Sequence, residues 1–396
     1  MSELNEVTNI GATFANRIIV IQQPRRLVFG NSCVAQFVED FAASGRRKAF
    51  IITAPPILPH VEPLMDSLKK KRIAVSVWDA ISSEPTIEMF EDARRAGQAA
   101  RMDAVIGVGG GSVLDVAKLV AALHDSEQDI RAVFGIGKLS GRNTYLACLP
   151  TTAGTGSEVS PNAIILDETE QLKKGVVSPH LVPDASYVDP LLTKTVPPDL
   201  TASTGMDALT HCVESYANLF AHPIIDIYAL QGIKLIGANL KLAYENGEDM
   251  EARAKMSLGS LYGGLCLGPV NTGAAHALAY PLGGEFHVSH GVSNSLLLPH
   301  VLEFNIPAMP ERYAQIAIAL GVKPASSDLE TAQRGLERIK QLSHECNLPA
   351  KLSGLVVPRE AIKRMAEAAM TVTRLLKNNP RELKQSDAEK IYEKAY

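Results

Sequence analysis

Hydrophobic and polar residues alternate along the first half of the chain in a pattern that predicts buried strands separated by amphipathic helices. Residues 18–21 and 26–30 are expected to form a hairpin-like pair of strands. Further strands are predicted at residues 48–53, 73–79, 103–108, 144–150, 162–167 and 185–189. Helical periodicity is found at residues 34–44, 86–102 and 112–123. Because strands alternate with helices, a mainly parallel sheet covered on both faces is expected.

The pattern changes near residue 195, and beyond it the apolar positions follow the helical period. Helices are predicted at residues 202–218, 224–246, 250–267 and 327–346. Ser386, with Glu389 three residues later, is typical of a capping box that begins a last helix. The sequence therefore predicts an α/β N-terminal domain (residues 1–195) with a mainly parallel, Rossmann-like sheet. An all-α C-terminal domain (residues 196–396) is expected to follow it.

Composition narrows the classes of protein to which the chain can belong. Its 396 residues are 46% hydrophobic and 21% charged, which fits two ordinary globular domains. A net charge of -4 is too small to indicate a nucleic acid partner. No run approaches about 18 apolar residues, and the N-terminus lacks signal-peptide features, so neither a membrane span nor secretion is expected. Five cysteines without a CxxC pair fit the free thiols of a cytoplasmic protein.

A glycine turn follows the strand predicted at residues 103–108. Gly109, Gly110 and Gly111 have no Cβ, so their backbone N–H groups can approach a phosphate closely. The helix that begins near Ser112 adds a positive dipole end, and together these features predict a pyrophosphate site. The spacing is not G-x-G-x-x-G, so a tight turn without a ligand remains an alternative. Ser112 and Asp115 are three residues apart, which also fits a cap on this helix.

A second loop, after the strand predicted at residues 144–150, carries Thr151, Thr152 and Thr155. Ligands of open α/β sheets bind at the carboxyl ends of the strands, so these hydroxyl groups are candidates for ligand contacts. An ordinary surface loop of the same composition is the alternative.

One aspartate and three histidines form a candidate metal site. Asp207 and His211 are four residues apart and share one helix face. His276 lies on a helix that Pro281 is expected to end, and His290 begins the next apolar run. Three imidazoles and a carboxylate suit Fe, Zn, Ni or Cu, and such an ion lowers the pKa of bound water from about 15.7 to about 7. It would act similarly on an alcohol. Each residue alone fits a cap or a surface pair better, so the hypothesis depends on the joint pattern.

The segments GVGGGSVLDVAK, PTTAGTGSEVS, GMDALTH and HALAYPLGGEFHVSHGVSNSLLLPHVLEFN occur in the order typical of the iron-containing (group III) alcohol dehydrogenases. The chain resembles that family over nearly its whole length. The resemblance implies the dehydroquinate synthase-like fold and an NAD(P)-dependent enzyme that interconverts alcohols with aldehydes or ketones. It also implies a cleft between the domains and a homodimer or larger assembly.

The resemblance assigns roles to particular residues. It implies that Fe2+, or Zn2+ in some members, is bound by Asp207, His211, His276 and His290. It implies that the cofactor, NAD or NADP, is held by the turn from Gly109 to Ser112, with Asp115 nearby, and by Thr151, Thr152 and Thr155. Either Lys173 or Lys174 is expected to face the cofactor.

The chain departs from the family pattern at two positions. Many NAD-using members have Asp at the end of the second strand, where this chain has Ala54, so one barrier to NADP is absent. Well-studied members also carry a proton-relay His four residues after the third metal ligand, where this chain has Tyr280. His287 is the candidate relay that remains, and its alternative is a solvent-facing loop residue. Tyr280 would then shape the pocket or bind the substrate.

Other functions are compatible with the same fold. A dehydroquinate synthase-like lyase would use NAD transiently, and a maleylacetate reductase-like enzyme can work without metal. A non-enzymatic role on a degenerate scaffold is the third alternative. The four intact ligands favour the metal-dependent dehydrogenase. The substrate itself is left open among short alcohols, diols, hydroxy acids and alcohols that bear phosphonate or sulfonate groups.

Overall fold

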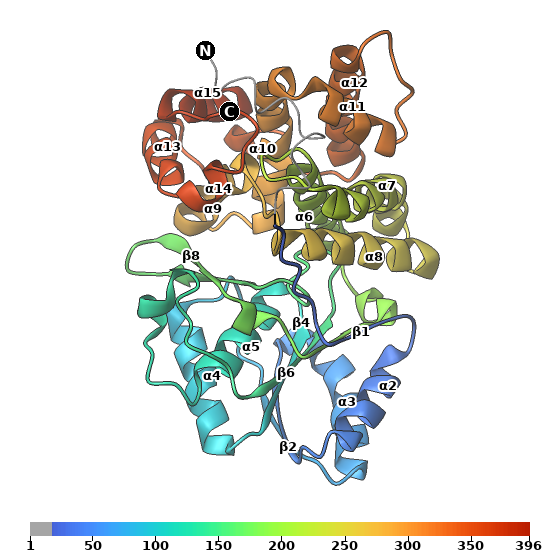
Figure 1. Ribbon diagram of the computed structural model, residues 1–396, viewed down its shortest axis with the longest axis vertical. Coiled ribbons are helices and arrows are strands. Elements are labelled where there is room, and N and C mark those ends of the chain that lie inside the picture. Colours follow the sequence, from blue (N-terminus) through green and yellow to red (C-terminus); the bar gives the residue numbers. More distant parts are fainter. Residues whose placement is uncertain (1–17) are drawn as a thin grey trace.

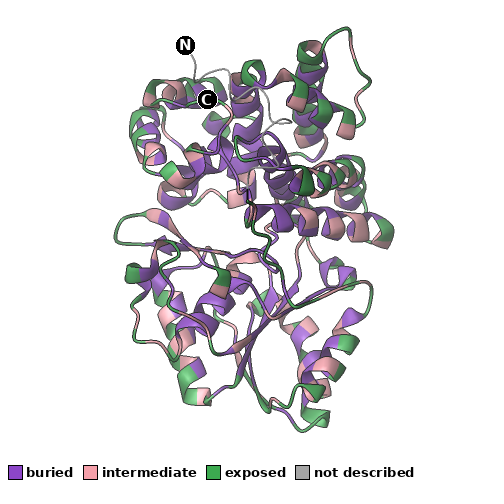
Figure 2. Cartoon of the chain, in the orientation of Figure 1, coloured by how far each residue is buried: buried purple, intermediate pink, exposed green. Residues whose placement is uncertain are grey.

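The computed structural model describes residues 18–396, so the N-terminal segment that was expected not to be a signal peptide lies outside the described residues. An α/β part contains the earlier half of the chain, and a helical part packs on top of it (Figure 1). Side chains in the interior of both parts are buried, and exposed positions follow the outer faces of the helices (Figure 2). None of the helices between residues 18 and 396 is long and apolar enough to cross a membrane.

The main sheet has six strands in the order β1-β9-β6-β4-β2-β3, and all neighbouring strands are parallel. The strands are β1 (Arg26–Phe29), β2 (Lys48–Ile52), β3 (Ala74–Trp78), β4 (Ala104–Gly109), β6 (Tyr145–Pro150) and β9 (Ala185–Val188). Gly109 at the end of β4 is level with Pro150 at the end of β6. The two loops that follow these strands therefore begin side by side at the carboxyl edge of the sheet.

Helices cover both faces of this sheet. They are α2 (Cys33–Ala43) and α3 (Leu58–Lys70) on one face, and α4 (Ile87–Ala100) and α5 (Gly111–Leu123) on the other. Neighbouring residues of β2 point to opposite faces: Ile51 packs in the same core as Phe37, whereas Phe50 packs with Phe90. This is why β2 reads as a continuous apolar run.

A smaller sheet lies between the α/β part and the helical part. It consists of β5 (Gly135–Ile136), β8 (Leu172–Val177) and β7 (Asn162–Asp167), with β7 and β8 antiparallel. Strand β8 also packs against α9, as Figure 1 shows. It was not expected from the sequence, because Lys173, Lys174 and Gly175 interrupt its apolar pattern.

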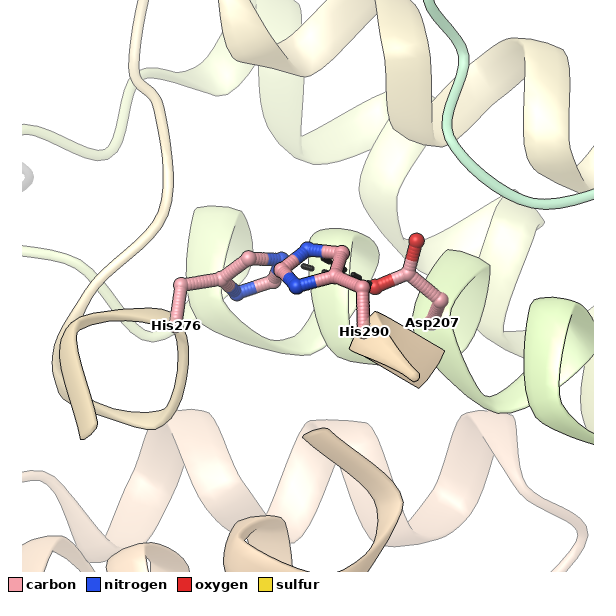
Figure 3. Close-up of side chains that lie close together, drawn as sticks. All are labelled: Asp207, His276 and His290. Carbon is pink, nitrogen blue, oxygen red and sulfur yellow. Dashed lines mark ion pairs between the residues drawn. The ribbon is translucent and has the colours of Figure 1, made fainter. Parts of the chain in front are cut away.

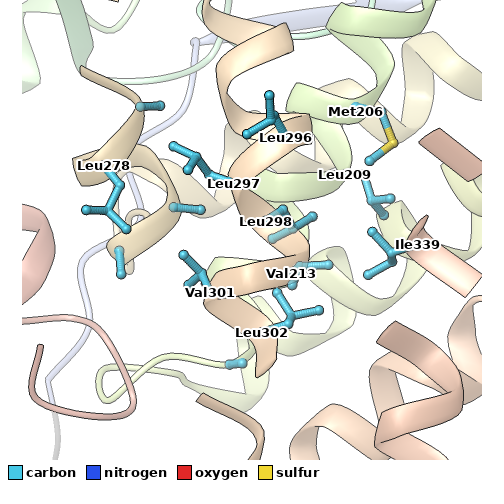
Figure 4. Packing of buried hydrophobic residues seen from close by; sticks show 14 of the residues in the cluster. Met206, Leu209, Val213, Leu278, Leu296, Leu297, Leu298, Val301, Leu302 and Ile339 are labelled. Atoms are coloured by element: carbon cyan, nitrogen blue, oxygen red, sulfur yellow. The ribbon is translucent and has the colours of Figure 1, made fainter. Parts of the chain in front are cut away.

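The remaining chain is helical. Its helices are α6 (Pro198–Tyr216), α7 (Pro223–Glu245), α8 (Met250–Leu267), α9 (Ala274–Phe286), α10 (His290–Asn305), α11 (Pro310–Ala319), α12 (Asp328–Glu345), α13 (Ile362–Met370), α14 (Thr373–Leu376) and α15 (Gln385–Ala395). Their core includes Leu209 of α6, Leu278 of α9 and Leu298 of α10, which belong to one hydrophobic cluster (Figure 4). The predicted fold class, a parallel α/β part followed by a helical part, is confirmed.

Two local predictions are wrong. Residues 18–21 form no strand, and β1 pairs with β9 in parallel rather than with its neighbour in sequence. The last helix begins at Gln385, and its capping carboxylate is Asp387, which accepts a hydrogen bond from the backbone N–H of Lys384 (3.2 Å). Ser386 therefore lies inside the first turn instead of capping it.

Candidate active site

A cleft of about 1440 Å³ lies between the carboxyl edge of the main sheet and helices α6, α9 and α10. Small-molecule sites usually enclose roughly 300–1000 Å³, so this cleft can hold a dinucleotide and a small substrate together. The residues predicted from the sequence that line it are Gly110, Gly111, Ser112, Asp115, Thr151, Thr152, Thr155, Lys173, Asp207, His211, His276, Tyr280, His287 and His290. Gly109 and Lys174 do not line it. Ala54, at the carboxyl end of β2, does.

The glycine turn brings the N-terminus of α5 to the cleft. Helix α5 begins at Gly111, with Gly110 as its N-cap, so no side chain covers its first N–H groups. Gly109 is packed against Val113, whose side chain a Cβ at position 109 would meet at 2.6 Å. The turn thus offers backbone N–H groups and a helix dipole to an anion.

Asp115 ties this helix to the neighbouring segment. Its carboxylate accepts hydrogen bonds from the Ser157 hydroxyl (2.5 Å) and from the backbone N–H of Ile164 (2.8 Å). The predicted cap by Ser112 and Asp115 is therefore wrong, because the carboxylate is engaged across the cleft wall. Lys118, which is fully buried, donates to the carbonyls of Ser160 and Asn162 (both 2.8 Å) and joins α5 to the same segment.

The threonine loop lies beside the glycine turn, as the strand register requires. Thr155 packs directly on Gly111, and Thr151 and Thr152 face the same cleft. Gly156 has a positive φ of 61° and contacts the backbone of Gly264 in α8, a position that no larger residue fits. The loop is therefore anchored to the helical part behind it.

The metal-site candidates come together in the helical part. Asp207 and His211 project from α6, His276 from the first turn of α9, and His290 is the first residue of α10. The Nε2 atoms of His276 and His290 each lie 3.6 Å from Asp207 Oδ1 (Figure 3). One ligand atom from each of these three residues lies within 4.8 Å of the others. His211 Nε2 lies 4.0 Å from Asp207 Oδ1, and its ring stacks on His276, at the edge of this group.

The expectation that Pro281 ends the helix of His276 is wrong. Helix α9 continues through Pro281 to Phe286. Residues 274–284 are all buried, so packing on both sides of the proline outweighs the one backbone hydrogen bond that it removes. The chain leaves α9 at His287, which adopts a left-handed conformation (φ 55°), and α10 begins three residues later.

Two buried residues that were not expected from the sequence support the cluster. Glu214 accepts from His276 Nδ1 (2.6 Å) and from the backbone N–H of Ala275 (2.6 Å). Asn294 Nδ2 donates to Asp207 Oδ1 (2.7 Å). Carboxylate and amide partners of this kind fix the orientation of metal ligands. Because Glu214 occupies Nδ1, the Nε2 of His276 is buried without a hydrogen-bond partner and faces Asp207, which fits a bound cation.

The charges in the cluster suit a cation as well. Burial would raise the pKa of Asp207, but the three neighbouring histidines lower it well below its ordinary range. Burial is the largest influence on His211 and His290 and lowers their pKa values to about 4 and about 3. For His276, burial is outweighed by the neighbouring carboxylates of Asp207 and Glu214, which raise the pKa to about 9. At neutral pH the carboxylate is ionised and the imidazoles of His211 and His290 are neutral, as metal ligands must be, whereas His276 releases a proton when it binds a cation.

Other candidate residues occupy different positions in the cleft wall. Lys173 is buried and its Nζ forms an ion pair with the half-buried Glu84 (2.9 Å), whereas Lys174 pairs with Glu170 outside the cleft. Tyr280 Oη accepts a hydrogen bond from Arg374 Nη2 (2.6 Å). His287 is exposed at the end of α9 and lines the cleft.

Comparisons with known proteins identify the family of the chain. The profile of the family described as "Iron-containing alcohol dehydrogenase" matches residues 24–190, and that of the "Fe-containing alcohol dehydrogenase family, C-terminal" matches residues 201–396. The chain is 37% identical to long-chain-alcohol dehydrogenase 1 of Geobacillus thermodenitrificans (strain NG80-2) over 373 residues, 93% of this chain and 94% of the relative.

Solved structures have the same fold. A 1,3-propanediol oxidoreductase superposes with a TM-score of 0.93 at 32% identity, covering 96% of this chain and all of the other. The sulfoacetaldehyde reductase of Bifidobacterium kashiwanohense in complex with NAD+ has a TM-score of 0.86 at 27% identity, covering 96% and 99%. The chain therefore belongs to the iron-containing alcohol dehydrogenase family, whose members are metal- and NAD(P)-dependent oxidoreductases of alcohols and aldehydes.

Proposed function

We propose that the cleft transfers a hydride between the carbinol carbon of a small alcohol and the nicotinamide of NAD(P), with reduction of an aldehyde or ketone as the reverse reaction. One observation carries this proposal: the cluster of Asp207, His276 and His290 opens into the same cleft as the glycine turn at Gly110 and Gly111. A cation site and a pyrophosphate site in one cleft are the two requirements of this chemistry.

In this proposal Asp207, His276 and His290 hold the metal, and His211 completes the set. Glu214 keeps a proton on His276 Nδ1, so that Nε2 presents its lone pair to the cluster. When bound, the metal supplies positive charge that favours the deprotonated alcohol, and NAD(P) supplies the hydride acceptor.

The cofactor is proposed to lie along the carboxyl edge of the main sheet. Backbone N–H groups at Gly110, Gly111 and Ser112 bind its pyrophosphate, and Asp115 acts indirectly by holding α5 in place. The hydroxyl groups of Thr151, Thr152 and Thr155 face the bound dinucleotide. Ala54 leaves space and no negative charge near the adenosine ribose, so both NAD and NADP are candidates.

The alcohol proton is proposed to leave through His287. Its imidazole stands at the exposed end of α9, where it can exchange a proton between the cleft and solvent. Lys173 is proposed to line the nicotinamide end through its ion pair with Glu84, while Tyr280 shapes the substrate pocket.

Three broader features are also proposals. The division into domains is placed near residue 195, before α6 begins at Pro198. A cytoplasmic location is supported by five free, buried cysteines. A homodimer is supported by Ile224 and Ile227 of α7, apolar side chains that are 46% and 66% exposed and that a second copy of the chain would cover. Light scattering after gel filtration measures the size of the assembly.

The proposed function is tested by replacing one ligand. The substitution His276→Ala should remove the bound metal and the alcohol-dependent formation of NAD(P)H, because two imidazoles and a carboxylate hold a cation much more weakly than the full set of four ligands. Metal content is measured after anaerobic purification with iron supplied, and turnover is measured with both NAD+ and NADP+. Full activity in a metal-free His276→Ala protein would contradict the proposal. Substrate-dependent accumulation of NAD(P)H also separates a dehydrogenase from a lyase that uses NAD transiently.

A further inference from the structure

Arg374 is a cation in the wall of the cleft for which the family assignment provides no role. It lies on the short helix α14 and is half-buried, and it lines the cleft together with Tyr280 and His290. Its Nη2 donates a hydrogen bond to Tyr280 Oη (2.6 Å). Tyr280 is the residue at which this chain departs from the histidine of the family pattern, so the guanidinium contacts the position where the pocket differs.

The backbone around Arg374 is fixed by buried apolar contacts. Val372 and Leu375, two residues before it and one after, pack in one cluster with Ala277 and Tyr280 of α9. On the other side the guanidinium lies against Gly175 of β8, where a Cβ would come within 3.0 Å of Nη2. Arg374 thus extends from the helical part onto the α/β part, and the missing side chain at position 175 makes room for it.

The charge of Arg374 is left uncompensated by its surroundings. Within residues 18–396 no carboxylate lies at ion-pair distance from its guanidinium, and the Tyr280 hydroxyl takes one of its five N–H donors. The other cation of this region, Lys173, is by contrast paired with Glu84 at 2.9 Å. A positioned guanidinium with free donors matches the planar or trigonal oxygen arrays of carboxylate, sulfonate and phosphonate groups.

Arg374 is also close enough to the metal cluster to act on the same substrate. The Tyr280 ring centroid lies 6.3 Å from the His290 ring centroid and 5.7 Å from Arg374 Cζ. A molecule of a few carbon atoms that places its carbinol carbon at the cluster can therefore reach the guanidinium with its other end.

On the basis of the function proposed above, we infer that Arg374 selects substrates that carry an oxoanion group at the end opposite the alcohol or aldehyde. Tyr280 is a positioning residue in this scheme, because its hydroxyl holds the guanidinium at the pocket wall. Carboxylate and sulfonate share the chemistry that Arg374 recognises, and the two arms of the test distinguish them.

The test compares aldehydes that differ only in charge. In one pair, 4-oxobutanoate is matched with 4-methylpentanal, in which an isopropyl group replaces the carboxylate. In the other pair, sulfoacetaldehyde is matched with 3,3-dimethylbutanal, in which a tert-butyl group replaces the sulfonate. For at least one pair, the metal-loaded protein should show kcat/KM for the anion at least about tenfold above that of the neutral partner. In Arg374→Gln this ratio should fall to about one, mainly through KM.

A matched control is available in Arg364, whose guanidinium pairs with Glu285 outside the cleft. The substitution Arg364→Gln makes the same charge change and should leave the ratio as in the parent protein. Tyr280→Phe should lower the ratio by a few-fold, because the guanidinium loses its acceptor. A parent ratio near one for both pairs, or an unchanged ratio in Arg374→Gln, would overturn the inference.

A binding measurement keeps this inference separate from the proposed function. Calorimetry on the protein loaded with metal and cofactor compares 4-hydroxybutanoate with 4-methylpentan-1-ol. Tighter binding of the anion that is lost in Arg374→Gln supports the inference even if neither aldehyde is reduced, in which case the proposed function fails alone. Equal binding of the two alcohols, together with reduction of both aldehydes, would overturn the inference and leave the proposed function intact.

Discussion

Glu214 orients one ligand of the metal cluster, His276, because its carboxylate accepts a hydrogen bond from His276 Nδ1 at 2.6 Å. The substitution Glu214→Gln keeps the volume but removes the charge that fixes this tautomer. We expect metal affinity to fall by about 10- to 100-fold, with part of the activity restored at high metal concentration. Competition with a chelator measures the affinity. Glu285→Gln, which removes the half-buried ion-pair partner of Arg364, is the control and should bind metal normally.

Helical spacing alone would have been enough to identify two of the residues that hold the metal ligands in place. Glu214 follows His211 by three residues on α6, and Asn294 follows His290 by four on α10, so each shares a helix face with a predicted ligand. Glu84 and Arg374 lie in loop or short helical segments far from the cluster in sequence. No periodicity connects them to it, and only the tertiary structure brings them into the cleft.

Glu158 makes stability depend on pH. Burial raises its pKa to about 7 from an ordinary 4.5, with the attraction of Lys118 too weak to compensate. The folded protein therefore holds a proton that the unfolded chain releases near pH 4.5. The resulting stabilisation is complete below that pH and is lost as the pH rises to about 7.

The substitution Glu158→Gln removes this dependence. Relative to the parent protein, the variant should gain on the order of 3 kcal/mol of unfolding free energy between pH 4.5 and pH 7. Urea unfolding at several pH values measures the difference. Glu382→Gln, at an exposed position, serves as the control. A constant difference between Glu158→Gln and the parent across this range would contradict the assigned pKa.

At the scale of elements, Asp115 joins α5 both to strand β7 and to the loop that precedes it. The substitution Asp115→Ala leaves the Ser157 hydroxyl and the Ile164 N–H without their acceptor in a partly buried place. We expect a loss of about 1–3 kcal/mol in stability and a rise of about tenfold in the KM for NAD(P), because the N-terminus of α5 is no longer held at the cleft. Denaturant unfolding and cofactor kinetics measure the two effects.

Asp249→Ala separates stability from cofactor binding. Asp249 caps α8 by accepting from the backbone N–H groups of Glu251 and Ala252, and it does not line the cleft. Its loss should cost about 1 kcal/mol in stability and leave the KM for the cofactor unchanged. A similar rise in KM in both variants would show that general destabilisation, and not the position of α5, is responsible.

Elements with strong periodicity were predictable, and elements defined by their neighbours were not. The apolar runs of β2, β4 and β6 identify them without any structure, because strands buried on both faces contain few polar residues. Strand β8 has two lysines and a glycine and is formed by pairing with β7. Strand β1 lies at an edge, where its partner β9 comes from a segment about 160 residues later. Sequence adjacency could not identify that partner.

At the scale of the whole molecule, the cleft is assembled from both parts of the chain. The glycine turn belongs to the α/β part, whereas the metal ligands come from three helices that pack against it. Neither part contains the complete site. The order of the motifs along the sequence therefore identified the components, and the packing of α6, α9 and α10 over the sheet edge accounts for their proximity.

A cation bound to α6, α9 and α10 should stabilise the whole helical part. A ligand that binds only the folded state raises the unfolding free energy by RT ln(1 + [L]/Kd), about 2.7 kcal/mol at one hundred times Kd. We expect Fe2+ or Zn2+ to raise the Tm of the protein from which metal has been removed. A chelator should reverse the change. In His276→Ala the metal should have little effect, while NAD(P)+ should still raise the Tm through the glycine turn. An equal response to metal in His276→Ala would mean that the cation stabilises the fold elsewhere, because the remaining three side chains cannot reproduce the affinity of the full set.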